Sequence, residues 1–539
     1  MNDLLKKNQD NVSTYFNQGN LFKQSGKWEE AAAAYRRCLE LNPDFSWYHH
    51  NLGEVLAQQG KLEEAGDCYQ RACELNPNSA WSWHGLGEML ERQGNWDGAV
   101  AAYRRAVEIY PDFYEFHNSL GKALCFQGQL EEALGCLRQA IELDAESALP
   151  YENLWEVLAR LGQVDEGIEC LRQAIALNPG SWELYMKLAE ALQGKNELQE
   201  ALAGYGKAIQ LNPDFYWLRY KLGTALAATG QWEEAIASYK QAAELEPGAA
   251  IVHHYLGHTL AIVQRWEEAI VSYKKTLELS PESAVVYQHL GDALARLQRW
   301  SEAVASYRKS VKLEPNSLEG QDHLGFALTQ LQQWDEAIGC YRKALELSPN
   351  SDVVYCHLGD ALRQRGTEQD LDEAASCYHK AIELTPNNLE ICQKVLEMKP
   401  IDHEAQFQLG QALAAQGQWQ QAIEAYVLYI DIKPDNYEVH HLLGEALAAR
   451  GQWQQAIEAY RRAVDLDPNS SQSYHNMGEA LMAIDEMDKA IEAYRQSAEL
   501  DPDNPLIYNN LGDALAKQGK VDEASAAYRR SVELETKVF

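Results

Sequence analysis

Apolar residues recur through the chain in pairs of short segments, each with the spacing of an amphipathic helix. The stretch from Leu222, LGTALAATGQWEEAIASYKQAAELEP, is typical of these pairs. Its LGTAL and AIASY segments place apolar residues three or four positions apart, which is the pattern of a helix with one buried face. Gly230 lies between the segments and tolerates a positive φ, while Pro247 follows them and cannot continue a helix. The pattern predicts two antiparallel helices, A and B, joined by a tight turn.

The same pattern returns about every 34 residues. When each repeat is numbered from the third residue after the preceding proline, position 8 is Gly in thirteen of fifteen repeats, position 20 is Ala in fourteen and position 24 is Tyr in thirteen. Because one hairpin cannot bury its apolar face alone, neighbouring repeats must stack. The prolines that mark the period are Pro43, Pro77, Pro111, Pro179, Pro213, Pro247, Pro281, Pro315 and Pro349, with a second series at Pro434, Pro468 and Pro502.

These features resemble the tetratricopeptide-repeat family, which has Leu and Gly in helix A, Ala and an aromatic residue in helix B, and a closing proline. The resemblance covers almost the whole chain, although position 11 is usually Leu where the family often has Tyr. It implies an all-α fold, a right-handed superhelical solenoid of about 15 antiparallel helix–turn–helix repeats. We expect an N-terminal lead (1–11), eleven repeats (12–388), a partial repeat (389–402) and four further repeats (403–539).

The period is interrupted near residue 390. After Gly366 the sequence gains three residues, TEQ, and we expect a longer loop there. The next two prolines, Pro386 and Pro400, are only 14 residues apart, and the segment between them reads as a helix B without its helix A. Two interpretations stay open: a hinge near 386–402, or a lone helix that continues the stack with a local kink.

A second irregularity falls in the fifth repeat. Trp155 stands where glycine is usual, and Gly167 stands where alanine is usual. A large residue facing a smaller one suggests an exchange of volume at the helix crossing, so we predict that Trp155 packs against Gly167. In the last repeat Val521, Ala524 and Tyr528 follow the buried pattern of the other repeats. Either a partner or second copy covers this end, or the terminal helix leaves a modest apolar patch exposed.

Composition and charge limit the classes of partner that this chain is expected to bind. With 47 basic and 80 acidic residues the net charge is −33, which repels phosphate backbones and favours neutral or basic protein segments as partners. The ten cysteines stand singly inside helical patterns, as in a reducing compartment. No apolar run is long enough for a membrane-spanning helix and no secretory signal pattern is seen, so we expect a cytoplasmic protein without membrane insertion, cofactor or nucleic acid.

The resemblance also implies that positions 2, 5, 6 and 9 of helix A face a concave groove. Asparagines at position 6 resemble the ladder by which some relatives hold a peptide backbone, and the acids at position 9 would favour basic peptides. The alternatives are solvated polar residues, ordinary surface charge and, for the tryptophans, packing against helix B. The predicted peptide-binding residues are Asn17, Asn51, Asn476 and Asn510, with Lys187 and Lys221, at position 6; Trp47 and Trp81 at position 2; and Glu54, Glu88, Glu445, Glu479 and Asp513 at position 9.

Other candidate chemistry in the groove is weaker. Position 5 never holds the lysine that chaperone-type repeats use to grip a terminal carboxylate, although a small basic cluster could take an acidic side chain. His254 and His258 lie one helical turn apart, and His289 lies in the next helix A, so a metal site there is a weak alternative to surface histidines. Position 5 histidines and position 9 acids form four expected i, i+4 pairs: His50–Glu54, His84–Glu88, His441–Glu445 and His475–Glu479.

The sequence therefore predicts a non-catalytic scaffold or adaptor that binds peptide segments of other proteins. All residues are consumed by repeats, and no catalytic motif is found. Two other functions stay open. The array could be the recognition or targeting subunit of a separate modifying enzyme, such as a sugar transferase or sulfotransferase, or it could be a structural rod that self-associates through its C-terminal end.

Overall fold

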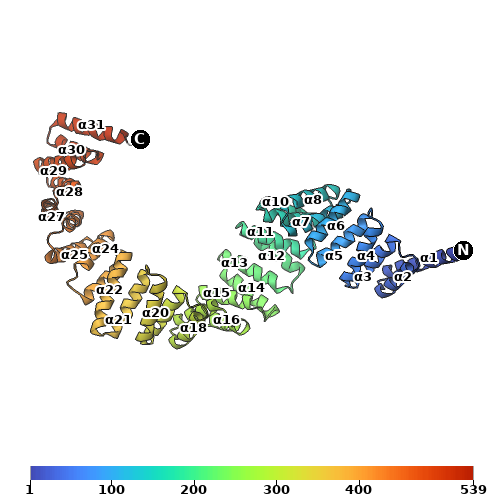
Figure 1. The fold of residues 1–539 in the computed structure, drawn as a ribbon. Helices are drawn as coiled ribbons and strands as arrows, with labels where there is room; N and C mark the ends of the chain where they lie inside the picture. The colour runs from blue at the N-terminus through green and yellow to red at the C-terminus, as the bar shows by residue number, and fades with distance from the viewer. Residues whose placement is uncertain (1, 538–539) are drawn as a thin grey trace. The chain divides into compact units, whose positions relative to one another are not determined.

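The computed structural model describes residues 2–537, which form 31 α-helices and, over that range, no β-strand (Figure 1). The predicted all-α array of antiparallel hairpins is confirmed. The A helices are α1 (Asn2–Gln24), α3 (Ser46–Gln58), α5 (Ala80–Arg92), α7 (Tyr114–Gln127), α9 (Ala148–Arg160), α11 (Trp182–Gly194), α13 (Tyr216–Ala228), α15 (Ala250–Ile262), α17 (Ala284–Arg296), α19 (Leu318–Gln330), α21 (Asp352–Arg365), α24 (His403–Ala415), α26 (Tyr437–Ala449), α28 (Ser471–Ala483) and α30 (Pro505–Lys517).

The B helices alternate with them, and the eight that begin with tryptophan do so at position 17. They are α2 (Trp28–Leu41), α4 (Leu62–Leu75), α6 (Trp96–Ile109), α8 (Leu130–Leu143), α10 (Val164–Leu177), α12 (Leu198–Leu211), α14 (Trp232–Leu245), α16 (Trp266–Leu279), α18 (Trp300–Leu313), α20 (Trp334–Leu347), α22 (Glu368–Leu384), α25 (Trp419–Ile432), α27 (Trp453–Leu466), α29 (Met487–Leu500) and α31 (Val521–Lys537). A single extra helix, α23 (Leu389–Met398), stands between α22 and α24.

The chain forms two compact units, Met1–Val263 and Gln264–Phe539, so that α15 ends the first and α16 begins the second. Within each unit a helix packs mainly against the helices before and after it in the chain. No helix between residues 2 and 537 is both long and apolar enough to cross a bilayer. The predicted hinge at 386–402 lies inside the second unit and stays a prediction.

The hairpins are closed by contact between position 8 of helix A and position 24 of helix B. A Cβ built on Gly223 would lie 2.6 Å from Cε1 of Tyr239, so only glycine fits at this crossing. Tyr239 and Ala235 are fully buried there. The turn that follows helix A places Gly230 at φ +75°, a conformation that other residues rarely adopt. The three most regular positions of the sequence are therefore the ones that set the hairpin geometry.

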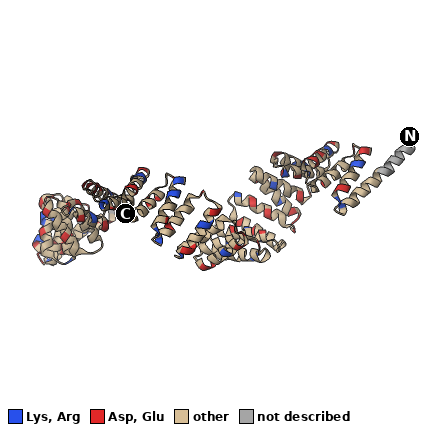
Figure 2. Cartoon of the chain, turned by 90° about the horizontal axis from the view of Figure 1, so that it is seen from below, with Lys and Arg blue, Asp and Glu red and all other residues tan. Residues whose placement is uncertain are grey.

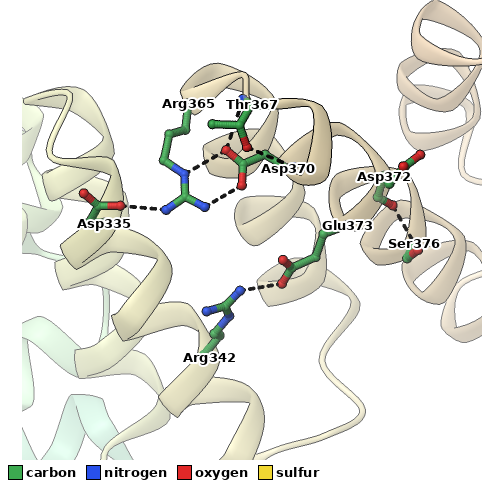
Figure 3. Close-up of polar contacts among 8 residues, drawn as sticks. All are labelled: Asp335, Arg342, Arg365, Thr367, Asp370, Asp372, Glu373 and Ser376. Atoms are coloured by element: carbon green, nitrogen blue, oxygen red, sulfur yellow. Dashed lines mark hydrogen bonds and ion pairs between the residues drawn. The ribbon is translucent and has the colours of Figure 1, made fainter.

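The three extra residues of repeat 11 do not lengthen a loop, as the sequence led us to expect. They extend helix B, so that α22 has 17 residues where a typical helix B has 14. Thr367 and Asp370 form a capping box at its start, each side chain accepting a backbone N–H of the other residue. Arg365 then holds the buried Asp370 through Nε (2.8 Å) and Nη2 (2.5 Å) and reaches Asp335 at 2.6 Å (Figure 3). These contacts anchor the added turn of α22 to repeat 10 through Asp335 and to repeat 11 through Arg365.

The side-chain contacts of α23 are those of a helix A. Lys394 Nζ lies 3.0 Å from Oδ2 of Asp360, which lies on α21. Glu397 Oε2 accepts a hydrogen bond of 2.7 Å from Arg363, which also lies on α21. In regular repeats the same contacts join position 6 to position 9, and position 9 to position 12, of neighbouring A helices. The C-terminal end of α23 instead resembles that of a helix B, because Lys399 caps it at φ −129° and ψ 84° and donates its N–H to the Val395 carbonyl, as Asn212 does to Ala208 at the end of α12. The interpretation of this segment as a helix B without its helix A therefore stays a prediction.

Candidate peptide-binding surface

Side chains at positions 5, 6 and 9 of neighbouring A helices contact one another along each unit. Position 6 reaches either position 5 or position 9 of the preceding repeat, so these positions share one surface, which we call the A face. Acidic and basic residues lie on helices throughout both units (Figure 2). The contacts are Asn153–Asn118 (2.8 Å), Lys187–Glu152 (2.6 Å), His357–Asp322 (2.8 Å), Lys221–Glu190 (2.8 Å), His323–Asp292 (3.0 Å), Asn476–Glu445 (3.1 Å) and Asn510–Glu479 (3.1 Å).

The predicted asparagine ladder is only partly accessible. Asn51 is 3% exposed; its amide nitrogen donates to the Trp47 carbonyl at 2.7 Å and its oxygen accepts from Lys23 at 3.5 Å. Its carboxamide is thus occupied within the chain, and a role for Asn51 in holding a peptide backbone stays a prediction. Asn17 is exposed and lines a hollow of about 290 Å³ on α1. Asn476 and Asn510 each donate one hydrogen bond to a position 9 glutamate, as described above.

The basic cluster of unit 1 consists of Lys122, Lys187, Arg219 and Lys221, and three of the four have a carboxylate partner, whereas Arg219 donates to Gln241 Oε1 at 2.6 Å. Lys187 and Lys221 each pair with a glutamate of the preceding repeat, at 2.6 and 2.8 Å. Lys122, a third member of the cluster, pairs with Glu91 at 2.6 Å. A peptide carboxylate at these lysines would have to compete with the glutamate that each ammonium group already contacts, and their use as receptors for an acidic side chain stays a prediction.

The acids at position 9 are engaged to different degrees. Glu54 pairs with Lys23, and Asp513 accepts a hydrogen bond of 2.7 Å from the Tyr528 hydroxyl. Glu88 is exposed, and desolvation within the A face raises its pKa. Glu445 and Glu479 accept from asparagines, as given above, and also lie 3.2 and 3.4 Å from the histidine one helical turn earlier in each case. Two of the four expected histidine–acid pairs, His441–Glu445 and His475–Glu479, are thus formed.

The other two histidines of that set, His50 and His84, are half-buried beside serines. His50 Nδ1 lies 3.2 Å from Ser82 Oγ, and His84 Nε2 lies 3.0 Å from Ser119 Oγ. Burial lowers the pKa of each histidine to about 4, because the charged ring would lose its hydration. Both rings are therefore neutral at physiological pH.

The two predicted aromatic anchors, Trp47 and Trp81, are half-exposed but already have ring partners. Trp47 stacks on His50 with centroids 4.6 Å apart, and Trp81 packs edge-on against Phe113, the N-cap residue of α7, at 4.8 Å. Each keeps one part of its indole open to solvent. The predicted choice between groove anchor and structural packing is thus not exclusive.

A cleft on the A face of unit 2 was not predicted. It has a volume of about 830 Å³ and spans α17 to α21. Phe326, at position 9, and Val353, at position 2, are 41% and 52% exposed. Phe326 is the only phenylalanine at position 9 in any repeat. This departure from the polar residues usual at position 9 is the sequence signal from which the cleft could have been predicted. The remaining lining residues are Trp266, Asp292, Ala295, Arg296, Gln298, Trp300, Tyr307, Asp322, His323, Ala327 and His357.

Two carboxylates of this cleft are held by hydrogen bonds. Asp292 accepts from the Tyr307 hydroxyl at 2.7 Å and lies 3.0 Å from His323 Nδ1, and this contact raises the pKa of His323. Asp322 lies 2.8 Å from His357 Nδ1. The cleft combines an apolar wall with fixed carboxylates, an arrangement suited to a side chain with an apolar stem and a positive end.

A metal site receives no support from the geometry. His254 and His258 lie on α15 in the first unit, whereas His289 lies on α17 in the second. Among the residues that the structure describes, no group of three or more His, Cys, Asp or Glu side chains is arranged to hold a metal ion.

Comparison with known families identifies the repeats. The model of the C-terminal domain of cilia and flagella-associated protein 70, a tetratricopeptide-repeat domain, matches residues 3–216 and 390–537. Tetratricopeptide-repeat models match residues 223–261, 325–366, 284–317, 205–237 and 353–388. The chain therefore belongs to this family of tetratricopeptide repeats, whose members are typically protein–protein interaction modules. Among curated proteins, none matches the chain.

Several solved structures are similar to parts or most of the chain. A crystal structure of MamA shares 28% identity, covering 33% of this chain and 95% of that one, with a TM-score of 0.27. The crystal structure of the APC/C hetero-tetramer Cut9–Hcn1 shares 16% identity over 94% and 96%, with a TM-score of 0.33. PilF of Pseudomonas aeruginosa shares 21% over 40% and 97%, with a TM-score of 0.36. Because every TM-score lies below 0.5, none of these likenesses bears on function.

Proposed function

We propose that this chain is a non-catalytic scaffold that binds peptide segments of other proteins on its A face and prefers neutral or basic segments. The observation that carries the proposal is the unit 2 cleft, where Phe326 and Val353 are exposed beside Asp292 and Asp322. Exposed apolar side chains in a concave site are the usual anchors of an interface. The carboxylates add a preference for Lys or Arg in the bound segment.

The proposed peptide-binding surface continues along the A face towards the C-terminus. Glu445, Glu479 and Asp513 follow one another on α26, α28 and α30, with Asn476 and Asn510 between them. A peptide that is anchored in the cleft by an apolar side chain meets further acids along this surface. The net charge of −33 attracts basic segments over a longer range, and salt weakens that attraction.

The experiment is a capture from native lysate with the full chain as bait and mass spectrometry as the readout. Phe326→Ala combined with Val353→Ser removes the apolar wall, and we expect it to lose the captured proteins. Val271→Ser is the matched control, because Val271 is 68% exposed on α16 and does not line the cleft. Retention of the same proteins by the cleft variant would contradict the proposal.

The charge preference is tested separately. Fluorescent peptides of matched length and apolar content, with positive, zero or negative net charge, are titrated onto the full chain. We expect the positive peptide to bind most tightly and to lose affinity with salt. If the captured proteins are enzymes of the sugar-transferase or sulfotransferase type, the chain is instead a recognition subunit. If the chain captures mainly copies of itself, it is a structural rod.

A further inference from the structure

The B helices carry two regular sets of exposed ion pairs between neighbouring repeats. A basic residue at position 25 pairs with the glutamate at position 19 of the next repeat, as in Arg36–Glu64 (3.1 Å), Arg104–Glu132 (2.7 Å), Arg138–Glu166 (2.7 Å), Arg172–Glu200 (3.0 Å), Arg308–Glu336 (2.6 Å) and Arg495–Glu523 (2.7 Å). A basic residue at position 26 pairs with the acid 27 residues earlier, as in Arg71–Asp44 (3.6 Å), Arg462–Asp435 (3.9 Å) and Arg530–Asp503 (4.0 Å). These positions are therefore normally charged and solvated.

Repeat 12 replaces both pairs by uncharged residues. Val427 stands at position 25 with Gln455 as its counterpart, and Leu428 stands at position 26 with Ile401 as its counterpart, 27 residues earlier. No other repeat has an apolar side chain at position 25 or 26. Ile401, Leu428 and Val427 are 78%, 49% and 43% exposed. We call these three residues the repeat-12 patch.

A cleft of mixed lining adjoins the patch, with Gln420, Gln452, Gln455 and Glu458 as its polar residues. It has a volume of about 430 Å³, and Val427 and Ile423 of α25 line it together with Leu443 and Ala459. The first turns of α25 and α27 are also uncharged, because both carry Gln–Gln at positions 18 and 19, where every other repeat has at least one acid. Ile423 and Val427 are one helical turn apart, so the cleft offers two successive apolar contacts along the helix.

The rim of this surface is acidic. Glu424 and Asp431 are exposed on α25 within one turn of the patch, and Glu458 is exposed and lines the cleft. In other repeats the acid at position 29 pairs with the base three residues earlier, as in Arg37–Glu40 (2.6 Å) and Arg71–Glu74 (3.0 Å). For Asp431, the residue three positions earlier is Leu428, which carries no charge. Within residues 12–536, none of the three carboxylates forms an ion pair.

We propose that the repeat-12 patch and its cleft dock an amphipathic helix of a partner protein, with apolar residues on one face and Lys or Arg beside them. The apolar face covers Ile401, Val427 and Leu428, and the basic residues reach the three rim carboxylates. A second copy of the chain is disfavoured as the occupant, because each copy carries a net charge of −33. This surface lies on the B helices, so the interaction is additional to peptide binding on the A face.

The test restores in repeat 12 the ion pairs that the other repeats carry. The variant combines Ile401→Asp, Leu428→Arg, Val427→Arg and Gln455→Glu. A display library of random peptides about 20 residues long, enough for roughly five helical turns, is selected against the full wild-type chain. We expect enriched peptides with apolar residues at i, i+3 or i+4 and i+7 and flanking Lys or Arg, binding the restored variant at least about tenfold more weakly.

Three controls make the result decisive. Circular dichroism establishes that the restored variant folds; if it does not, Leu428→Gln with Val427→Gln replaces it, because glutamine is found at both positions in other repeats. Asp435→Asn with Arg462→Gln removes the ion pair between the end of repeat 12 and repeat 13 and should leave binding unchanged, as should Val271→Ser on the exposed face of α16. The proposal is overturned if no enriched peptide distinguishes the restored variant, if the enriched peptides are acidic or not amphipathic, or if light scattering finds a wild-type dimer that the restored variant abolishes.

Discussion

Trp155 of helix A packs directly against Gly167 of helix B in the fifth repeat. A Cβ built on Gly167 would lie 2.5 Å from Cε3 of Trp155, closer than any side chain permits. The predicted exchange of volume is confirmed: the indole occupies the space that position 20 alanine and position 24 tyrosine fill in other repeats. Leu171, at position 24, is fully buried in the same cluster.

This pairing makes Gly167→Ala destabilising although alanine is the better helix former. Overpacking against the indole should cost about 1–3 kcal/mol of local stability. Hydrogen exchange of the α9 and α10 amides measures it, because a long repeat array does not unfold in one step. Adding Trp155→Gly and Leu171→Tyr, which restores the usual Gly–Ala–Tyr set, should recover part of the loss.

Gly135→Ala is the control for that experiment. Gly135 lies on α8 with no atom within 4 Å of an added Cβ, so alanine should stabilise the helix by about 0.5–1 kcal/mol. Equal effects at Gly135 and Gly167 would contradict the packing account.

The half-buried histidines predict that the first repeats lose stability in acid. The folded-state pKa of His50 and His84 is about 4, below the value of about 6.5 in an unfolded chain. The unfolded state therefore binds more protons below pH 6.5, and stability is lost progressively as the pH falls from 6.5 towards 4. At pH 5 the loss should be about 1–2 kcal/mol for each histidine.

Hydrogen exchange of the α3 to α5 amides at pH 7.5 and 5, corrected for intrinsic rates, measures this loss. In the variant His50→Gln with His84→Gln the dependence on pH should flatten. An unchanged dependence would assign the acid sensitivity to other groups.

In the A-face cleft the pKa of another histidine, His323, shifts upwards, in the opposite direction to those of His50 and His84. The contact with Asp292 raises the pKa of His323, so the ring gains its proton above pH 6.5 as the pH falls. The proton neutralises charge beside Asp292, and binding of a basic peptide should weaken as the pH drops through that pKa. Isothermal titration at pH 8 and 6 measures the change, and His323→Gln should remove most of it. Equal weakening in both proteins would exclude His323 as the cause.

The capping box of α22 predicts a local loss of stability in Thr367→Ala. Removing the cap should cost about 1 kcal/mol, because the Asp370 amide loses its acceptor. Ser376→Ala on the same helix is the control, since its hydroxyl only bonds the Asp372 carbonyl one turn back (Figure 3). Exchange of the first α22 amides should rise in the first variant and not in the second.

The fold was largely predictable because the same few contacts recur in most repeats. The spacing of Gly223, Ala235 and Tyr239 encodes one helix crossing, and that crossing is shared by all but a few repeats. The closing proline of α23 is consistent with its helix B type of C-terminal end, but it does not predict the contacts of Lys394 and Glu397 with α21, which depend on how neighbouring repeats stack. The extra turn of α22 depends on the capping box of Thr367 and Asp370, and the three added residues alone did not distinguish this extra turn from a longer loop.

The candidate site was less predictable, for a physical reason. Sequence position identifies which side chains share a face, but it does not reveal which of them neutralise each other across repeats. Lys187 and Lys221 are neutralised in this way, and Asn51 accepts a hydrogen bond from Lys23 of the preceding repeat. The cleft instead arises where Phe326 breaks the run of polar residues at position 9.

The most direct measurement of where this chain holds its partners is site-specific photo-crosslinking. A photoreactive phenylalanine replaces Phe326 in one protein and Val271, which is exposed outside the cleft, in another. Irradiation in native lysate, followed by mass spectrometry, identifies what each position touches. We predict protein adducts at position 326 that are competed by a basic peptide, and none of them at 271. Adducts that are equal at both positions, or absent at 326, would contradict peptide binding in the A-face cleft.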